Sequence, residues 1–356
     1  MRKIDFGPDL GFTEIYNLIK VIRSGQLSQG KFSKNFKKDL DVFLDVENTK
    51  SYLTNSGTSS LLLALLSLNL QSDDEVIVPA LTFGATANAV LLAGAKVVMA
   101  DVSEKDFLLD VSKLESLITS KTRVIIVVHL FGMPCDLSYI ATLAVKYNLT
   151  VIEDAAQAFG AIYKNKSVGT QGDFGCFSFY PTKIITSGEG GLITFKNQIH
   201  SSKINMLINQ GMRVKYEYEL PGYNFRLDEL SAAVGLAQLQ KAKRFIKSRR
   251  NVASYYLSKL KGCEFQFENL DSISSYSQFS VRTESNRRKL ITKHFAEQNI
   301  PYSIFYPKSL DEFQIYGDQK ECLTSQKLSN ELISLPISSR IRKFQLDKVI
   351  KAFNGA

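Results

Sequence analysis

The fold is decided by the stretch RVIIVVHLFGMPCDLSYIATLAVKYNLTVIEDAAQ, residues 123–157. Residues 123–128 and 149–153 are short runs rich in Val and Ile, which favour β-strands. Residues 137–147 between them are expected to form a helix. A strand, a helix and a second strand in this order predict a βαβ unit, in which the two strands run parallel.

Strand-like and helix-like runs continue to alternate on both sides of this unit. Further strands are expected over residues 75–78, 96–100, 175–180 and 191–195. Further helices are expected over residues 59–69, 86–92 and 111–118. This alternation predicts an α/β domain built around a mainly parallel central sheet.

The C-terminal third has a different character. The chain has 356 residues, which at about 150 residues per domain favours roughly two domains. A long helical stretch over about residues 227–260 leads away from the sheet region, and residues 263–356 contain fewer glycines and several short runs of both kinds. We predict a large α/β domain over residues 1–240, including an N-terminal segment, and a smaller C-terminal α+β domain over residues 241–356.

Composition excludes several classes of protein. Hydrophobic residues make up 44% and charged residues 22% of the chain, an ordinary globular balance that excludes disorder, collagen and coiled coil as the dominant state. The longest runs without Asp, Glu, Lys or Arg are residues 51–72 and 76–95, and both are interrupted by polar residues, glycines or Pro79, so neither supplies the ~20 consecutive apolar residues of a membrane span. The first seven residues lack the apolar stretch of a signal peptide. We therefore expect a cytoplasmic protein with no membrane partner.

The chain carries an excess of basic residues, 44 Lys and Arg against 35 Asp and Glu, which gives a net charge of +9. Much of the excess lies in residues 241–250 and 287–289. Such runs form solvated helix faces, bind small anionic substrates or bind nucleic acid. No helix-turn-helix, zinc-finger or aromatic RNA-binding signature accompanies them, so we expect no nucleic-acid partner.

The cysteines and histidines are scattered along the chain. A metal site needs ligands that converge, and no CxxC pair occurs, so we expect no metal. Free thiols are expected, because disulfides are rare in the cytoplasm. The cysteines are Cys135, Cys176, Cys263 and Cys322.

Two segments place reactive side chains just after predicted strands, where α/β sheets bind ligands. Asp154 ends the strand of residues 149–153, although Glu153 can instead be the inward carboxylate. Lys183 follows the strand of residues 175–180. Desolvation of such a lysine lowers its pKa and leaves a nucleophilic amine, as Schiff-base chemistry requires, whereas a solvated loop lysine would stay charged.

Two other segments indicate the starts of helices, NSGTSSL at residues 55–61 and GYNFRLDE at residues 222–229. Backbone amides at a helix start, with the hydroxyl of Thr58, can bind a phosphate, although a plain N-cap also explains the first segment. No GxGxxG or Walker motif occurs, so dinucleotide and nucleoside triphosphate binding lack their fingerprint.

Seven motifs follow one another along the chain in an order that belongs to one family. They are SGT at 56–58, DEVIVPALTFGAT at 74–86, VHLFG at 128–132, IEDAAQ at 152–157, CFSFYPTK at 176–183, GEGG at 188–191 and GYNFR at 222–226. With them the sequence resembles the DegT/DnrJ/EryC1/StrS aminotransferases, pyridoxal-phosphate (PLP) enzymes that aminate nucleotide-linked keto-sugars. The resemblance covers about residues 25–256 and continues more loosely to the end. It implies the fold-type I aminotransferase fold.

The resemblance implies roles for individual residues. Lys183 matches the lysine that holds PLP and moves the proton, and Asp154 matches the partner of the pyridinium nitrogen. Gln157 matches the residue beside the ring hydroxyl, and Phe83 matches the aromatic residue stacked on the ring. The implied phosphate ligands are Gly57, Thr58 and Ser178, with Asn224 supplied by the neighbouring subunit.

The same resemblance implies the reaction and the partners. L-glutamate is the amino donor and leaves as 2-oxoglutarate, and a nucleotide-linked keto-sugar becomes an amino-sugar for glycans such as lipopolysaccharide O-antigen. The role of Asn224 implies a homodimer with active sites at the subunit interface. Arg226 is a candidate substrate contact.

The sugar position that is aminated depends on a C-terminal motif. Family members that aminate the third carbon often have His-Tyr-Pro, where this chain has Phe305, Tyr306 and Pro307. Tyr306, Gln314 and residues 275–282 favour a 3-keto sugar linked to UDP or dTDP, with UDP-linked 2-acetamido sugars nearest. Phe305 removes a polar contact, so a 4-keto sugar stays open. Phe305 and Tyr306 are therefore candidate substrate-binding residues.

Two other classes remain as alternatives. A PLP-dependent dehydratase of related sequence has histidine where this chain has Lys183, and another fold-type I reaction such as C–S bond cleavage would share the same core residues. A non-catalytic regulator on this fold would have little reason to keep Lys183, Asp154 and Gln157 together.

Overall fold

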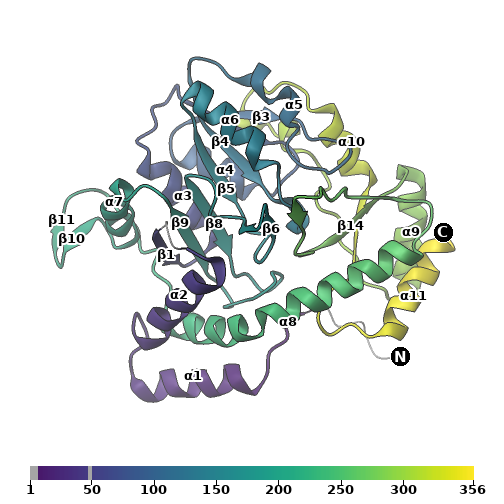
Figure 1. The fold of residues 1–356 in the computed structure, drawn as a ribbon, viewed down its shortest axis with the longest axis horizontal. Helices are drawn as coiled ribbons and strands as arrows, with labels where there is room; N and C mark the ends of the chain where they lie inside the picture. The colour runs from purple at the N-terminus through teal and green to yellow at the C-terminus, as the bar shows by residue number, and fades with distance from the viewer. Residues whose placement is uncertain (1–6, 47–49) are drawn as a thin grey trace.

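A seven-stranded sheet forms the centre of the molecule (Figure 1). Its strand order is β1-β9-β8-β5-β4-β2-β3. The five strands from β8 to β3 run parallel, whereas β9 is antiparallel to both β8 and β1. The mainly parallel α/β sheet is therefore confirmed. The strands are β1 (Lys50–Thr54), β2 (Glu75–Pro79), β3 (Lys96–Ala100), β4 (Thr122–Val128), β5 (Thr150–Asp154), β8 (Phe174–Ser178) and β9 (Gly191–Phe195).

The structure is a computed structural model that describes residues 7–46 and 50–356. Residues 1–6, on which the expectation of no signal peptide mainly rests, lie outside the described residues, as do residues 47–49. Within the described part of the chain, no helix combines the length and the apolar composition that crossing a bilayer requires.

Helices cover both faces of the central sheet, and alternate residues of a strand therefore enter different cores. In β4, Ile125 and Val127 belong to one core, and Val124 and Ile126 belong to the other. Burial on both faces explains why the parallel strands are continuous apolar runs. The first core is covered by α2 (Lys31–Leu44), α6 (Leu137–Tyr147) and the start of α8 (Glu229–Lys259), and the second by α3 (Gly57–Ser67), α4 (Ala85–Leu92) and α7 (Ile199–Ile208).

A third core lies in the C-terminal part, around a three-stranded antiparallel sheet. The helix α8 belongs to both regions, because Phe245 packs in the first core and Tyr256 in the third. The predicted boundary between residues 240 and 241 falls inside this helix, and the division into two domains stays a prediction. The C-terminal elements are β12 (Glu264–Phe265), β14 (Phe279–Arg282), α9 (Ser285–Glu297), α10 (Leu323–Glu331), β15 (Leu332–Leu335) and α11 (Lys343–Asn354).

The remaining elements are the helices of the N-terminal segment, one edge strand and several short elements. Four features of the structure were not predicted from the sequence. They are α1 (Phe12–Ser24), α2, the edge strand β1 and the hairpin of β10 (Met212–Val214) and β11 (Glu217–Tyr218). The helix expected over 111–118 is divided into α5 (Val111–Leu114) and the 3-10 turn η1 (Glu115–Leu117). The others are η2 (Leu130–Gly132), β6 (Ile162–Tyr163), β7 (Lys166–Ser167), β13 (Ser272–Ile273), η3 (Leu310–Glu312) and η4 (Gln314–Tyr316).

A buried carboxylate joins two helices of the first core. Glu229, in the first turn of α8, is only 2% exposed. Its Oε1 accepts hydrogen bonds from the amides of Gly30 and Ser33, both at 2.7 Å, and its Oε2 accepts one from the amide of Phe32 at 2.8 Å. These amides start α2, where a negative charge is favourable. Glu229 thus fixes the start of α2 against α8.

We expect Glu229→Ala to lower the free energy of unfolding by about 2–3 kcal/mol, because it leaves buried amides without a charged acceptor. Urea unfolding followed by circular dichroism measures this loss. Glu217→Ala is the matched control, because Glu217 is exposed on the β10–β11 hairpin. Equal unfolding midpoints for the two variants would contradict the role given to Glu229.

Candidate active site

The carboxyl ends of β2, β4, β5 and β8 lie at one edge of the sheet. The predicted site residues follow these ends: Phe83 comes after β2, Asp154 ends β5, and Ser178 ends β8 with Lys183 shortly beyond. The structure therefore brings together residues that are up to 100 positions apart in the sequence. This edge is where parallel α/β sheets bind ligands.

Asp154 is a buried carboxylate with two hydrogen-bond donors. Its Oδ2 accepts a hydrogen bond from Thr86 Oγ1 at 2.8 Å, and its Oδ1 accepts one from the amide of Ala156 at 3.1 Å. Burial raises the pKa of Asp154 above its ordinary value, and the two donors and the positive charge of Lys183 work against that rise. The two hydrogen bonds thus fix the position of the carboxylate, and a cationic partner would further stabilise its ionised form.

Glu153 is also buried, on the opposite side of the strand. It accepts hydrogen bonds from the amides of Gly169, Gln171 and Gly172 at 2.5–2.7 Å, and His129 Nε2 lies 2.9 Å from its Oε2. Burial alone would raise the pKa of Glu153, but the hydrogen bonds from His129 and from the backbone amides lower it overall. Protein groups satisfy Glu153, so it is a structural carboxylate and its neighbour is the one left for a ligand.

Lys183 lies in the loop after β8 and is partly buried. Its amide donates a hydrogen bond to the carbonyl oxygen of Tyr180 at 2.9 Å. Burial lowers the pKa of its ammonium group, and the charge of Asp154 partly opposes this shift. The surroundings of Lys183 therefore make its amine less basic than that of the solvated loop lysine that the sequence left open.

Gln157 connects the carboxylate edge to the C-terminal part of the chain. Its Oε1 accepts a hydrogen bond from the amide of Phe131 at 3.0 Å, and its Nε2 donates one to the hydroxyl of Tyr306 at 3.0 Å. The ring centroid of Tyr306 lies 6.0 Å from that of Phe83. Phe83 is 59% exposed, so its ring is free to stack on a flat ligand.

The start of α3 forms a candidate anion site. Ser56 caps this helix by accepting a hydrogen bond from the amide of Ser59 at 3.1 Å. Among the described residues, no acceptor is paired with the amides of Gly57 and Thr58. A Cβ on Gly57 would lie 2.8 Å from the Cβ of Ser178, so the glycine lets the helix start approach the end of β8 closely. Two open amides and nearby hydroxyls suit a phosphate group.

Asn224 and Arg226 lie on a segment beside this helix start. The amide of Asn55 donates a hydrogen bond to the carbonyl oxygen of Phe225 at 2.8 Å, and Asn55 Nδ2 donates one to the carbonyl oxygen of Asn224 at 3.4 Å. The side chain of Asn224 is exposed, and Arg226 Nη1 donates to Asn209 Oδ1 at 2.6 Å. The contribution of Asn224 to a neighbouring subunit stays a prediction.

Sequence reasoning missed two polar residues of this edge. Thr86 is part of a motif quoted above but received no role, although it donates the shorter hydrogen bond to Asp154. His129 follows the end of β4 directly, so the strand-end rule that selected Asp154 applies to it as well. No sequence pattern predicts which hydroxyl meets the carboxylate, because Thr86 and Asp154 are 68 residues apart.

The chain belongs to the DegT/DnrJ/EryC1/StrS aminotransferase family, whose model it matches over residues 8–354. A relative from Caulobacter vibrioides, GDP-perosamine synthase, is 42% identical over 235 residues, which cover 65% of this chain and 63% of that protein. UDP-N-acetyl-3-dehydro-alpha-D-glucosamine 3-aminotransferase from Acidithiobacillus ferrooxidans is 34% identical over 83% of this chain and 80% of its own length.

A solved structure shares the fold over nearly the whole chain. Spr1654, a candidate sugar aminotransferase from Streptococcus pneumoniae in its PLP form, has a TM-score of 0.91 and 26% identity over 99% of this chain and 98% of its own. The matches confirm the predicted family, fold and enzyme class, and the family implies PLP as cofactor. The roles of the individual site residues stay predictions.

We expect Thr86→Val to raise the pKa of Asp154, because it removes a donor that stabilises the ionised carboxylate. At neutral pH the cofactor-free variant should lose about 1–3 kcal/mol of stability. The loss should shrink as the pH falls through the pKa of Asp154, where the carboxyl gains a proton. Chemical unfolding at several pH values measures both effects.

The matched control for Thr86→Val is the same substitution in an Asp154→Asn background. Without the carboxylate, Thr86→Val should cost clearly less, and the difference between the two costs is the coupling between the side chains. Equal costs in both backgrounds would contradict a specific interaction between Thr86 and Asp154.

Proposed function

We propose that this enzyme transfers the amino group of L-glutamate to a keto group of a nucleotide-linked sugar, with PLP as cofactor. The observation that carries the proposal is that Asp154 at the end of β5 and Lys183 in the loop after β8 lie at one sheet edge, close enough for the charge of each to act on the pKa of the other. A lysine with a lowered pKa and a buried carboxylate are the two groups that PLP chemistry requires from a protein.

The residues of this edge fit PLP. The open amides of Gly57 and Thr58, with Ser178 close by, would hold its phosphate. The exposed ring of Phe83 would cover one face of its ring, and Asp154 would pair with its ring nitrogen. When bound, PLP supplies an electron sink for electrons released at the reacting carbon.

Asp154 would keep a cationic partner charged. Its two donors fix the orientation of the carboxylate, so that its charge need not be reoriented when a ligand binds. Thr86 acts through Asp154 and is a positioning residue. Burial raises the pKa of the unliganded carboxyl of Asp154, because it destabilises the ionised form. A cation that binds beside Asp154 would offset part of this electrostatic cost.

Lys183 would move the proton. A lowered pKa increases the fraction of neutral amine near neutral pH. Nζ could therefore accept a proton from the reacting carbon of the donor in the first half-reaction and deliver a proton to the reacting carbon of the sugar in the second, with the hydrogen and the electron pair retained on the bound cofactor between the two. Burial also raises the pKa of Tyr306, which keeps its hydroxyl protonated beside Gln157. Phe305 packs against Tyr306 with ring centroids 5.6 Å apart and adds an apolar wall.

For the acceptor we propose a 3-keto sugar linked to UDP or dTDP, with a 4-keto sugar as the alternative. Tyr306 and Gln314 support the 3-keto assignment on sequence grounds, and the A. ferrooxidans relative is named for a UDP-linked 3-dehydro sugar. The C. vibrioides relative is named for a GDP-linked product. We further propose a cytoplasmic homodimer in which Asn224 contributes to the partner's phosphate site, and an amino-sugar product used in glycan synthesis.

The acceptor assignment predicts transfer of isotopically labelled nitrogen from glutamate to a 3-keto sugar. Purified enzyme with PLP is incubated with UDP-, dTDP- and GDP-linked 3-keto and 4-keto sugars, and products are identified by mass spectrometry. We expect the highest kcat/KM for a UDP- or dTDP-linked 3-keto sugar. A preference for a 4-keto sugar would establish the alternative, and no labelled product from any sugar would contradict the proposed function.

We expect Lys183→Ala to reduce multiple-turnover activity below about one thousandth of wild type, because it removes the amine proposed to hold the cofactor and to accept the proton. The fold should remain, as judged by circular dichroism. Lys121→Ala is the control, since Lys121 lies just before β4, at the opposite edge of the sheet, in an exposed ion pair with Asp73. Substantial turnover by the Lys183 variant would contradict the role of this lysine.

A further inference from the structure

The first described residues of the chain lie beside the loop that carries Lys183. Residues 7–9 (Gly-Pro-Asp) line a small cavity, and Lys183 and Ile184 line the same cavity. Its volume is about 20 Å³, which is room for about one water molecule. We call residues 7–9 the closing segment, because they form one wall of this narrow space.

Three side chains of α8 hold the closing segment. Gln238 Nε2 and Lys241 Nζ both donate hydrogen bonds to the carbonyl oxygen of Asp9 at 2.9 Å. Arg244 Nη2 lies 3.0 Å from Oδ2 of Asp9. These side chains follow one another at intervals of three residues, so one face of the helix supplies them all. The segment passes α8 before the chain enters α1 (Figure 1).

The C-terminal part of the chain also contacts the closing segment. Ser339 Oγ donates to Oδ2 of Asp9 at 3.5 Å, and Arg340 Nη1 donates to the carbonyl oxygen of Pro8 at 3.4 Å. Both distances are longer than those of typical hydrogen bonds. Arg244 and Arg340 are exposed, so substitutions at the surface can weaken the hold on the segment without disturbing a core.

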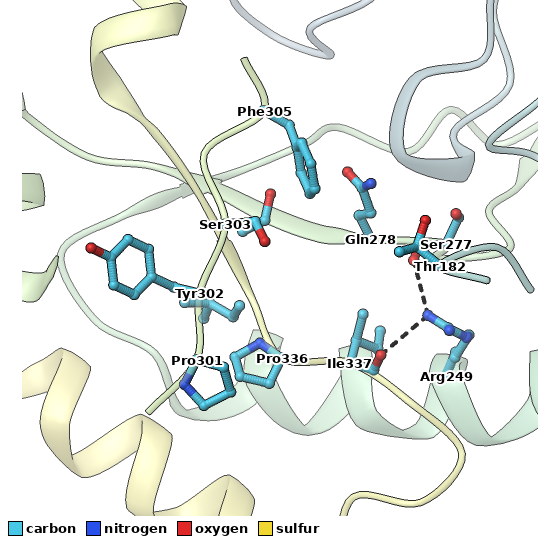
Figure 2. A pocket seen from close by; sticks show the side chains of 12 residues that line it. Thr182, Arg249, Ser277, Gln278, Pro301, Tyr302, Ser303, Phe305, Pro336 and Ile337 are labelled. Carbon is cyan, nitrogen blue, oxygen red and sulfur yellow. Dashed lines mark hydrogen bonds between the residues drawn. The ribbon is translucent and has the colours of Figure 1, made fainter. Parts of the chain in front are cut away.

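Another wall of the small cavity is fixed. Arg249 lines this cavity too and is 8% exposed. Its Nη1 donates to the carbonyl oxygens of Ser277 at 2.9 Å and Ile337 at 3.2 Å, the two dashed bonds of Figure 2. With Thr182 it also lines a neighbouring cavity of about 90 Å³, whose residues Figure 2 shows. Arg249 should therefore stay in place when the closing segment is altered.

Water in the small cavity would change the ionisation of Lys183. Burial lowers the pKa of its ammonium group, and the charge of Asp154 partly opposes that shift. Two other charged groups, Asp9 and Arg249, share the cavity with it. Because Arg244 neutralises Asp9, the closing segment contributes the exclusion of water rather than a charge.

We propose that the closing segment is a positioning element for Lys183: it excludes water from the space beside this lysine, and its contacts with α8 keep it there. The proposal rests on the proposed function only for the role of Lys183 as the reactive amine. It also gives a function to the first part of the basic run 241–250, since Lys241 and Arg244 hold the segment. Residues 7–9 then act on the reaction through Lys183 and are not catalytic groups.

The test measures the pKa of Lys183 in the cofactor-free enzyme. Lysine amines are methylated with isotopically labelled formaldehyde, and NMR follows their signals as the pH is raised. The signal of Lys183 is the one that Lys183→Arg removes. The double variant Pro8→Gly, Asp9→Gly loosens the segment and removes its carboxylate. We expect the pKa of Lys183 to rise towards its ordinary value in this variant, because water stabilises the ammonium form.

Substitutions on α8 provide matched controls. Arg244→Ala removes the ion pair with Asp9 and should raise the pKa of Lys183 by a smaller amount; it also serves if the double variant does not fold. Arg244→Lys keeps the charge and should leave the pKa at its wild-type value. Lys243→Ala changes a neighbouring exposed lysine of the same helix and should also leave the pKa unchanged.

The rate at which PLP reacts with the cofactor-free enzyme is the second readout. Only the neutral amine reacts, so the pH midpoint of this rate should move in the same direction as the pKa of Lys183. At neutral pH the double variant should react at least about threefold more slowly than wild type. A segment with a purely structural role would lower the unfolding midpoint and leave both pH profiles unchanged.

Three results would overturn the proposal: an unchanged pKa of Lys183 in the folded double variant, an equal rise in Lys243→Ala, or a loss of stability with no shift in either pH profile. Failure of the proposed function gives a different pattern. A pKa of Lys183 that depends on the segment, without amination of any sugar, would remove the acceptor assignment and leave the closing segment. Amination of a sugar by an enzyme whose Lys183 pKa is independent of the segment would do the reverse.

Discussion

Burying a carboxylate costs free energy unless donors or cations compensate for it, and the end of β5 buries two adjacent carboxylates. Successive side chains of a strand point to opposite faces, so Glu153 and Asp154 meet different surroundings. Glu153 receives three backbone amides and the ring of His129. Its donors come from the end of β4 and from the loop that leads into β8, so this one carboxylate fixes the relative positions of three strand ends.

His129 extends the same network. Its Nδ1 accepts a hydrogen bond from the amide of Cys135 at 3.0 Å, so in the neutral ring Nε2 carries the hydrogen and donates it to Glu153. Its own amide donates to the carbonyl oxygen of Asp154. Glu153 and the backbone of Asp154 are thus linked through a single histidine. Among the described residues, two groups donate hydrogen bonds to the carboxylate of Asp154. The number of donors, rather than the degree of burial, therefore distinguishes the two carboxylates.

The sequence predicts what depends on local pattern and misses what depends on long-range pairing. The parallel strands are buried on both faces, so their Val- and Ile-rich runs are visible in the sequence. The edge strand β1 reads Lys-Ser-Tyr-Leu-Thr, a partly polar pattern that does not stand out, and it becomes a strand only by pairing with β9 far along the chain. The family motifs located the candidate site, but the bond between Thr86 and Asp154 required the folded structure.

The basic residues of the run 241–250 are neighbours in the sequence but make different contacts in the folded structure. From the sequence this run was interpreted as one solvated helix face. In the structure its basic side chains lie in different surroundings along α8. Lys241 pairs with the buried Glu14, and Arg244 lies 3.0 Å from Asp9, so these two hold the N-terminal segment against the helix. Arg249 is instead buried beside the Lys183 loop.

The same helix therefore serves two purposes. Its first turn caps α2 through Glu229, its middle turns anchor the N-terminal segment, and its last turns cross into and lie in the C-terminal core. A residue at that crossing is held by both cores at once, so its position is fixed before any ligand binds. Arg249 occupies this crossing, with carbonyl oxygens of the C-terminal part, Ser277 and Ile337, holding one edge of its guanidinium. The packing of the two cores and these two hydrogen bonds thus offset the entropic cost of ordering a long side chain.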